Sequence, residues 1–140
     1  FFKMKTLKEI GFFDENIFLY YEETDLYFRC HQANLGIYLI DEAEFTHIGS
    51  SSIDKKYEQQ IAINRNWHFC WSKFYYYKKN YSYFYGLKKT LPNLLRAIKR
   101  YLIFSLKGEQ IMAAKHKAEI DGLIASYMLR KSNFRPNIKI

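Results

Sequence analysis

Residues 11–29 read GFFDENIFLYYEETDLYFR, a run of aromatic residues interrupted by a short acidic cluster. The cluster consists of Glu22, Glu23 and Asp25. Acidic side chains within apolar sequence are costly to bury unless they are paired, bind a cation or take part in chemistry. From Glu22 onward the pattern becomes helical, because Leu26 and Cys30 recur one turn apart and Asp25 can pair with Arg29. The stretch therefore predicts a helix that carries carboxylates in its first turn.

The sequence on either side of this helix predicts short strands. Residues 1–10 are typical of a short strand that runs into a helical turn. Residues 37–40, IYLI, have the composition of a short buried strand, and residues 44–48 are typical of a second extended segment. Between the helix and the first of these strands, Gly36 is available for a left-handed helix cap. Strands that alternate with a helix indicate an α/β fold for the first part of the chain.

The pattern changes after Ser52, which divides the chain into two predicted parts, residues 1–52 and 53–140. Apolar residues spaced by threes and fours predict three helices in the second part, over about residues 53–79, 87–106 and 109–129. Pro92 is expected in the first turn of the middle helix or at a kink, and residues 131–140 are expected to be a loose tail. The second part is therefore predicted to be a mainly helical extension.

Charge is distributed unevenly between these parts. Residues 1–50 carry four Lys or Arg against nine Asp or Glu, whereas residues 51–140 carry eighteen against five. An acidic first part and a basic second part indicate two different kinds of surface. No apolar run reaches the roughly 18 residues of a membrane span, and Cys30 and Cys70 match no metal or disulfide pattern. These features predict a reducing, cytoplasmic location.

Three features could carry chemistry. A carboxylate at a helix start, here Glu22 or Glu23, can act as a general base on a hydroxyl. His47 lies near a predicted strand end, where a neutral imidazole can coordinate a divalent metal. Arg65 lies in the next predicted helix and can bind a phosphate. Each also has an ordinary structural interpretation, since acidic residues often cap helices and a single His is usually a packing residue.

Taken together, these residues resemble the C-terminal half of the catalytic domain of family 2 glycosyltransferases, closest to the bacterial rhamnosyltransferase-like branch. That family carries a Gly-x-Phe-Asp-Glu loop, an aromatic run, an acidic motif, an Arg four residues later, and a His after a short strand. The corresponding residues here are Gly11, Phe13, Asp14, Glu15, Glu22, Glu23, Asp25, Leu26, Arg29, Gly36 and His47. The resemblance covers about residues 5–52 densely and residues 53–79 loosely. It implies the C-terminal part of a GT-A, Rossmann-like domain.

The resemblance also implies roles for single residues. Glu23 would be the base that takes the proton from an acceptor sugar hydroxyl as that oxygen attacks the anomeric carbon with inversion, and Glu22 is the neighbouring candidate. His47 would be a metal ligand close to the leaving diphosphate, and Asp25 would orient the acceptor or brace Arg29. Glu stands at position 23, where the family more often has Asp, so the carboxylate must sit about one bond length further out.

The same resemblance implies a nucleotide-sugar donor, a saccharide or lipid-linked acceptor, and a divalent metal, Mg²⁺ or Mn²⁺. In the family an Asp-x-Asp motif in the nucleotide-binding half supplies the usual first metal ligand, and no such motif occurs here. We therefore expect the chain to be a fragment that lacks the donor half. Alone, it should bind nucleotide sugars poorly and turn over nothing measurable.

The basic second part has three possible uses. Polybasic amphipathic helices with Tyr and Trp suit an anionic membrane surface, which would place the protein peripherally on the inner face of the cell membrane. The helices could instead be a solvated subdomain, or could bind single-stranded nucleic acid, although no recognised nucleic-acid motif is present. A non-catalytic binding module is thus the main alternative to a transferase. A glycosidase is a weaker alternative, because its two acids must flank the scissile bond.

Overall fold

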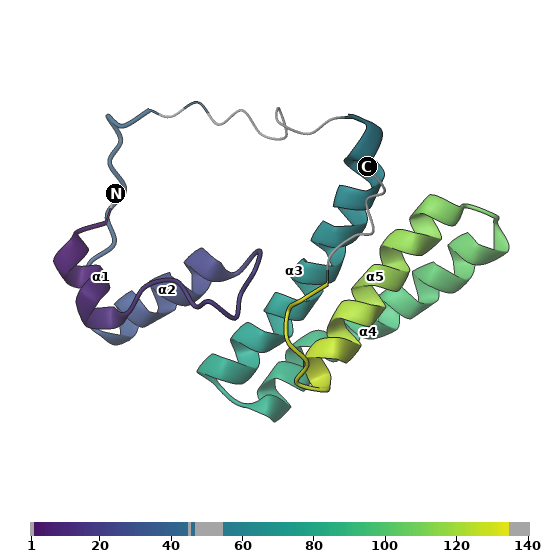
Figure 1. The fold of residues 1–140 in the computed structure, drawn as a ribbon. Helices are drawn as coiled ribbons and strands as arrows, with labels where there is room; N and C mark the ends of the chain where they lie inside the picture. The colour runs from purple at the N-terminus through teal and green to yellow at the C-terminus, as the bar shows by residue number, and fades with distance from the viewer. Residues whose placement is uncertain (1, 45, 47–54, 135–140) are drawn as a thin grey trace.

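The computed structural model describes residues 2–44, 46 and 55–134 (Figure 1). Two short helices, α1 and α2, lie beside a bundle of three longer helices, α3, α4 and α5. The elements in chain order are α1 (Met4–Ile10), α2 (Glu22–Gln32), the 3-10 turn η1 (Lys55–Tyr57), α3 (Glu58–Asn80), α4 (Tyr83–Leu106) and α5 (Gln110–Tyr127).

The predicted α/β fold is wrong, because no residue in the described part of the chain forms a strand. Residues 1–10, predicted to begin as a strand, contain α1 instead. Residues 37–40 carry the apolar composition of a strand, yet all four are exposed, Leu39 by 91%. A strand needs a neighbouring backbone for its N–H and C=O groups, and this segment has none among the described residues. The prediction that the first part of the chain is the C-terminal part of a GT-A, Rossmann-like domain is therefore wrong.

The three predicted helices of the second part form the α3–α4–α5 bundle (Figure 1). Its core contains two clusters, one around Trp67, Trp71 and Ala118 and one around Cys70, Phe74 and Leu123. Glycines allow the helices to approach closely. A Cβ on Gly122 of α5 would collide with the backbone carbonyl oxygen of Trp67 in α3, so the α3–α5 contact depends on a residue without a side chain.

The loop before α2 lies against the side of α3. Tyr21 packs on Phe69 and Tyr76, with ring centroids 5.7 and 5.5 Å apart, and the Leu19 carbonyl accepts a 2.8 Å hydrogen bond from the Ser72 hydroxyl. These side chains share one face of α3 because they recur at intervals of three and four. Leu26 and Cys30 of α2 are buried, as the helical pattern predicted. The aromatic run thus attaches the start of α2 to the bundle.

The chain after α5 is also attached to α3. The indole N–H of Trp71 donates to the Arg130 carbonyl at 2.9 Å, and the imidazole of buried His68 contacts the Ser132 hydroxyl and the Phe134 carbonyl at 2.9 and 3.0 Å. The Phe134 ring stacks on Trp67. The prediction of a loose tail from residue 131 is therefore wrong for residues 131–134, and residues 135–140 lie outside the described residues.

Helix α4 begins four residues earlier than predicted and contains Pro92 in its interior rather than its first turn. Its buried side chains are small: Gly86, Thr90 and Ala97. Leu87 and Leu94 pack on the core beside them, but the other large aliphatic residues of α4 are exposed. The apolar spacing alone could not reveal this division. None of the helices in the described ranges is both long enough and apolar enough to cross a membrane.

Candidate functional site

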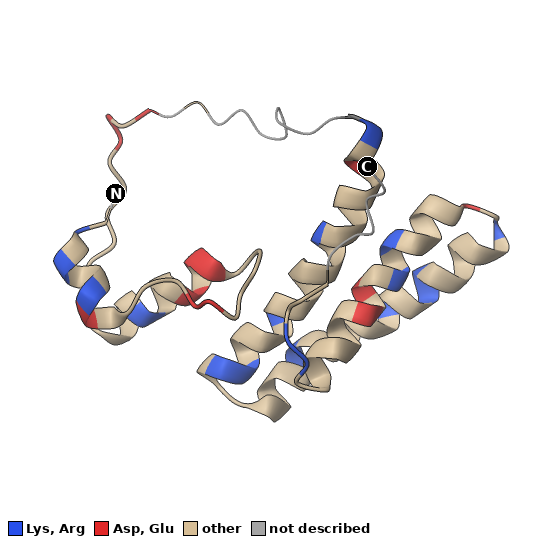
Figure 2. Cartoon of the chain, viewed as in Figure 1, with Lys and Arg blue, Asp and Glu red and all other residues tan. Residues whose placement is uncertain are grey.

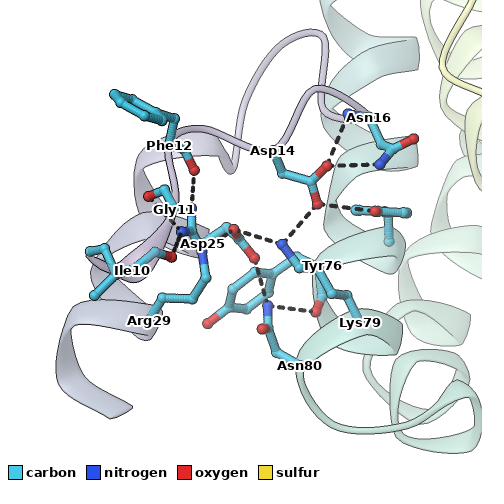
Figure 3. Close-up of polar contacts among 11 residues, drawn as sticks. Ile10, Gly11, Phe12, Asp14, Asn16, Asp25, Arg29, Tyr76, Lys79 and Asn80 are labelled. Carbon is cyan, nitrogen blue, oxygen red and sulfur yellow. Dashed lines mark hydrogen bonds and ion pairs between the residues drawn. The ribbon is translucent and has the colours of Figure 1, made fainter. Parts of the chain in front are cut away.

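Asp25 lies in the first turn of α2 and its side chain has no exposed surface. Its Oδ2 accepts hydrogen bonds from the Arg29 Nε at 3.0 Å and from the Lys79 Nζ at 2.8 Å, and its Oδ1 accepts from the Asn80 side chain at 3.0 Å (Figure 3). A buried carboxylate requires this degree of pairing to offset its desolvation. Asp25 is therefore held by a fixed set of partners that comes from α2 and α3.

Lys79 joins Asp25 to a second carboxylate. Its Nζ lies 2.8 Å from the Oδ2 atoms of both Asp14 and Asp25, pointing between them (Figure 3). Asp14 also accepts from the Tyr75 hydroxyl at 3.0 Å and from the backbone N–H and side chain of Asn16 at 2.9 Å each. Burial alone would raise the pKa of Asp14, but the hydrogen bonds from Lys79 and Asn16 outweigh it and lower the pKa to about 2.

Arg29 extends this network to the end of α1. Its guanidinium donates to the carbonyl oxygens of Ile10 at 2.6 Å, Gly11 at 3.0 Å and Phe12 at 2.7 Å. The last carbonyls of a helix have no partner within the helix, and a cation is favourable beside them. We call Asp14, Asp25, Arg29 and Lys79 the carboxylate clamp. The clamp joins α1, the following loop, α2 and α3 with two negative and two positive charges.

The two residues before α2 have an unusual backbone. Tyr20 and Tyr21 have φ values of 64° and 68°, in the left-handed region that residues with a side chain rarely adopt. Both rings pack on Phe69 of α3, with centroids 5.6 and 5.7 Å apart. Strain of this kind persists only where the surroundings enforce it, and it is concentrated at functional sites. The backbone of Tyr20 and Tyr21 therefore sets the orientation of the first turn of α2 relative to α3.

Glu22 and Glu23 lie directly after this turn, in surroundings unlike those of Asp25. Glu23 is exposed, and its carboxylate makes no hydrogen bond or ion pair to another described residue. Glu22 is half-buried, and its Oε2 atom is out of contact with water and without a hydrogen-bond partner. An acceptor oxygen in that state is unfavourable until a donor reaches it. Figure 2 shows these acidic residues on the start of α2, with Lys and Arg distributed along the bundle.

The other two predicted site residues are not brought to this acidic turn by any described contact. Arg65 lies on α3, half-buried, four residues before Phe69 and hence on the same face of the helix. No hydrogen bond or ion pair between Arg65 and the three acidic residues occurs in the described structure. His47 lies outside the described residues, and its predicted role as a metal ligand stays a prediction.

The resemblance implies a divalent metal, which needs several oxygen or nitrogen ligands placed close together. Within residues 2–44, 46 and 55–134, no three His, Cys, Asp or Glu side chains lie together in a way that could hold a metal. Asp14 and Asp25 already bind Lys79, which occupies the position that a cation between them would take. The described residues therefore do not fit the expected Mg²⁺ or Mn²⁺.

Sequence reasoning identified Asp25 and Arg29 as a pair but missed Lys79 and Asn80, which complete the surroundings of Asp25. Local spacing contains no signal for them, because they lie 54 and 55 residues further along the chain. The division at residue 52 stays a prediction. Comparison of the chain with protein-family models, curated proteins and solved structures finds no match.

Proposed function

We propose that the start of α2 is the acceptor side of an inverting glycosyltransferase site, with Glu23 as the general base. The observation that carries the proposal is the contrast among three acidic residues within one helical turn. Asp25 is fully buried and fixed by three partners, whereas Glu23 extends into solvent from the same turn. A general base needs a fixed backbone and a carboxylate that the substrate can reach.

In the proposed step, a hydroxyl oxygen of the acceptor attacks the anomeric carbon of a nucleotide sugar. The new C–O bond forms as the bond to the diphosphate breaks, and the diphosphate leaves with the electron pair of that bond. Glu23 accepts the hydroxyl proton during the attack. Direct displacement inverts the configuration at the anomeric carbon. No part of this step uses a metal held by the described residues.

The neighbouring residues have supporting roles in the proposal. Glu22, half-buried beside Glu23, is the second candidate to accept a hydroxyl of the saccharide. Asp25 is a positioning residue, since it holds α2 on α3 through Lys79. Arg65, one turn from Phe69 on the same face of α3, is proposed to bind the diphosphate. The acceptor class is a saccharide or a lipid-linked glycan of cell-surface polysaccharide synthesis.

The test measures transfer of labelled sugar from nucleotide sugars to lipid-linked acceptors, with the protein as its cell produces it and membrane extract of that cell as the acceptor source. Glu23→Gln keeps the size of the side chain but removes its basicity. We expect the transfer rate to fall by at least roughly a hundredfold, with nucleotide-sugar binding unchanged. The matched control is Glu9→Gln, an exposed acidic residue on α1, which should transfer at the wild-type rate.

Two results would contradict the proposal. If Glu23→Gln transferred sugar at the wild-type rate, Glu23 would be only a favourable charge at a helix start, worth a few tenths of a kcal/mol to about 1 kcal/mol. If the anomeric configuration of the product, read from its proton NMR coupling constant, were retained, the single direct displacement would be wrong.

A further inference from the structure

Most of the large aliphatic side chains of α4 face solvent, whereas Leu87 and Leu94 pack on the core of the bundle. Five of the exposed side chains recur at intervals of three and four, so they share one face of the helix. We call this face the α4 stripe: Leu91, Leu95, Ile98, Leu102 and Leu106. All five are exposed, from 37% for Ile98 to 89% for Leu106. The side of α4 that packs on α3 and α5 carries the small residues Gly86, Thr90 and Ala97, with Leu87 and Leu94 beside them.

The charges of α4 all have one sign. The helix contains no Asp or Glu and five basic residues, every one of them exposed: Lys88, Lys89, Arg96, Lys99 and Arg100. Lys88 and Lys99 lie next to the α4 stripe, three residues before Leu91 and four residues after Leu95. Arg96 and Arg100 follow the same edge of the helix one turn apart. The α4 stripe is therefore bordered by cations along its length.

Aromatic residues extend the stripe at the start of the helix. Phe84 lies seven residues before Leu91, on the same face, and is among the most exposed large apolar side chains of the described residues. Tyr81 and Tyr83 beside it are also exposed. Aromatic rings are favoured at the level of lipid headgroups, where an apolar ring and a polar edge are both accommodated.

We propose that α4 docks on the surface of an anionic lipid bilayer, with the α4 stripe buried among the acyl chains near the headgroups and its cations against lipid phosphates. Long Lys and Arg side chains can extend from an apolar face to reach the headgroups. Such a helix lies in the plane of the interface and does not cross the membrane. Burial of the α4 stripe and attraction of each cation act together.

The observations favour a bilayer over other occupants of this face. A second copy of the chain in a symmetric contact would place the five cations of one α4 near those of the other, which is unfavourable at close range. A nucleic acid would contact the basic edge but leave the apolar centre exposed. The inference is independent of the proposed sugar transfer, because lipid binding is measured without turnover.

The test is co-sedimentation of the full chain with vesicles of phosphatidylglycerol and phosphatidylcholine in equal parts, and with vesicles of phosphatidylcholine alone. Wild type should bind the anionic vesicles at least roughly a hundredfold more tightly. The triple variant Lys88→Gln, Arg96→Gln, Lys99→Gln should weaken anionic binding by roughly a hundredfold, about fivefold per charge. Its matched control, Lys3→Gln, Lys5→Gln, Lys8→Gln, removes three exposed lysines of the α1 region and should bind as wild type does.

A second pair of variants tests the apolar contribution. Leu91→Ser, Leu95→Ser, Leu102→Ser should abolish sedimentation with vesicles. Removing three exposed apolar residues elsewhere, with Ile37→Ser, Tyr38→Ser, Leu39→Ser, should leave it unchanged. Equal losses in the two variants would overturn the proposal, as would equal binding to both kinds of vesicle. Self-association in analytical ultracentrifugation that only the α4 variant abolishes, or binding of a single-stranded oligonucleotide without vesicle binding, would also overturn it.

Discussion

Glu23 and Asp25 are two residues apart in the sequence, but the structure surrounds them differently. Asp25 is buried among Arg29, Lys79 and Asn80, whereas Glu23 projects into solvent. The sequence predicted that acidic residues in this aromatic stretch must be paired or chemically active, and the structure contains one buried, paired carboxylate and one exposed carboxylate. Side chains of α3 determine which carboxylate is buried and which is exposed. Sequence spacing around residue 25 therefore could not distinguish them.

Loss of the Asp25 charge should destabilise the protein strongly. Asp25→Asn keeps the side-chain shape but leaves Arg29 without a carboxylate partner and Lys79 with Asp14 alone, so we expect the free energy of unfolding to fall by about 3 kcal/mol. Urea denaturation measures the change. The matched control is Asp121→Asn, which removes an exposed partner of Lys117 and should cost less than about 1 kcal/mol. Equal effects of the two substitutions would show that the buried carboxylate clamp contributes no more to the free energy of unfolding than an exposed ion pair does.

Asp14 should make the protein sensitive to acid. Hydrogen bonds from Lys79 and Asn16 outweigh the effect of burial and lower its pKa from 3.8 to about 2. A lowered pKa stabilises the folded state above the unfolded-state value, and this stabilisation is lost as pH falls from 3.8 towards about 2. The free energy of unfolding of wild type should therefore decrease more steeply across this window than that of Asp14→Asn. Parallel curves from urea titrations at several pH values would contradict this.

Three of the described helices have the same kind of C-terminal cap. Helices α2, α4 and α5 each end with a left-handed residue whose N–H, together with that of the next residue, bonds back to the last turn. The left-handed residues are Asn34, Gly108 and Leu129, with φ values of 54°, 72° and 58°. The sequence predicted Gly36 as the cap of α2, and the chain uses Asn34 instead, because Asn also tolerates this conformation.

Leu129 is the unusual member of this group, because the Cβ of a leucine in the left-handed region lies too close to the following carbonyl oxygen. Leu129→Gly should therefore raise the free energy of unfolding by about 0.5–1 kcal/mol, the relieved strain being partly offset by the greater freedom of the unfolded chain. The reverse change, Gly108→Ala, should lower it by about 1 kcal/mol, because a Cβ there meets no other atom and only backbone strain is added. Thermal unfolding of both variants measures the two signs, and a loss of stability in Leu129→Gly would contradict the interpretation.

The positions of α2, α3, α4 and α5 are close to the predicted ranges. These helices were predictable because the apolar spacing that indicates a helix is local in the sequence. The direction of the apolar face of α4 was not predictable. A periodic pattern shows that apolar residues share a face but does not show what that face meets. In α4 the side with small residues packs on the bundle together with Leu87 and Leu94, and the other large aliphatic side chains remain exposed. The strand expected over residues 37–40 failed for a related reason, because a strand is defined by a partner that local sequence does not specify.

At the scale of the whole molecule, the clamp connects the acidic turn to the bundle. Lys79 is near the end of α3, and through Asp14 and Asp25 it fixes both the loop before α2 and α2 itself (Figure 3). Aromatic packing of Tyr20 and Tyr21 on Phe69 adds a second attachment. The first turn of α2 is therefore positioned from two sides. These contacts could not be predicted from local sequence patterns, because they join residues more than forty positions apart.

In the proposed function Glu23 acts as the base and Asp25 only positions α2, and one paired measurement separates these two roles. The free energy of unfolding and the rate of sugar transfer are measured on the same preparations of Glu23→Gln and Asp25→Asn. Glu23→Gln should lose at least roughly a hundredfold in transfer rate while its free energy of unfolding stays within about 0.5 kcal/mol of wild type. Asp25→Asn should lose about 3 kcal/mol of stability. A stable, folded Glu23→Gln variant that transfers sugar at the wild-type rate would contradict the proposed role of Glu23 as the general base.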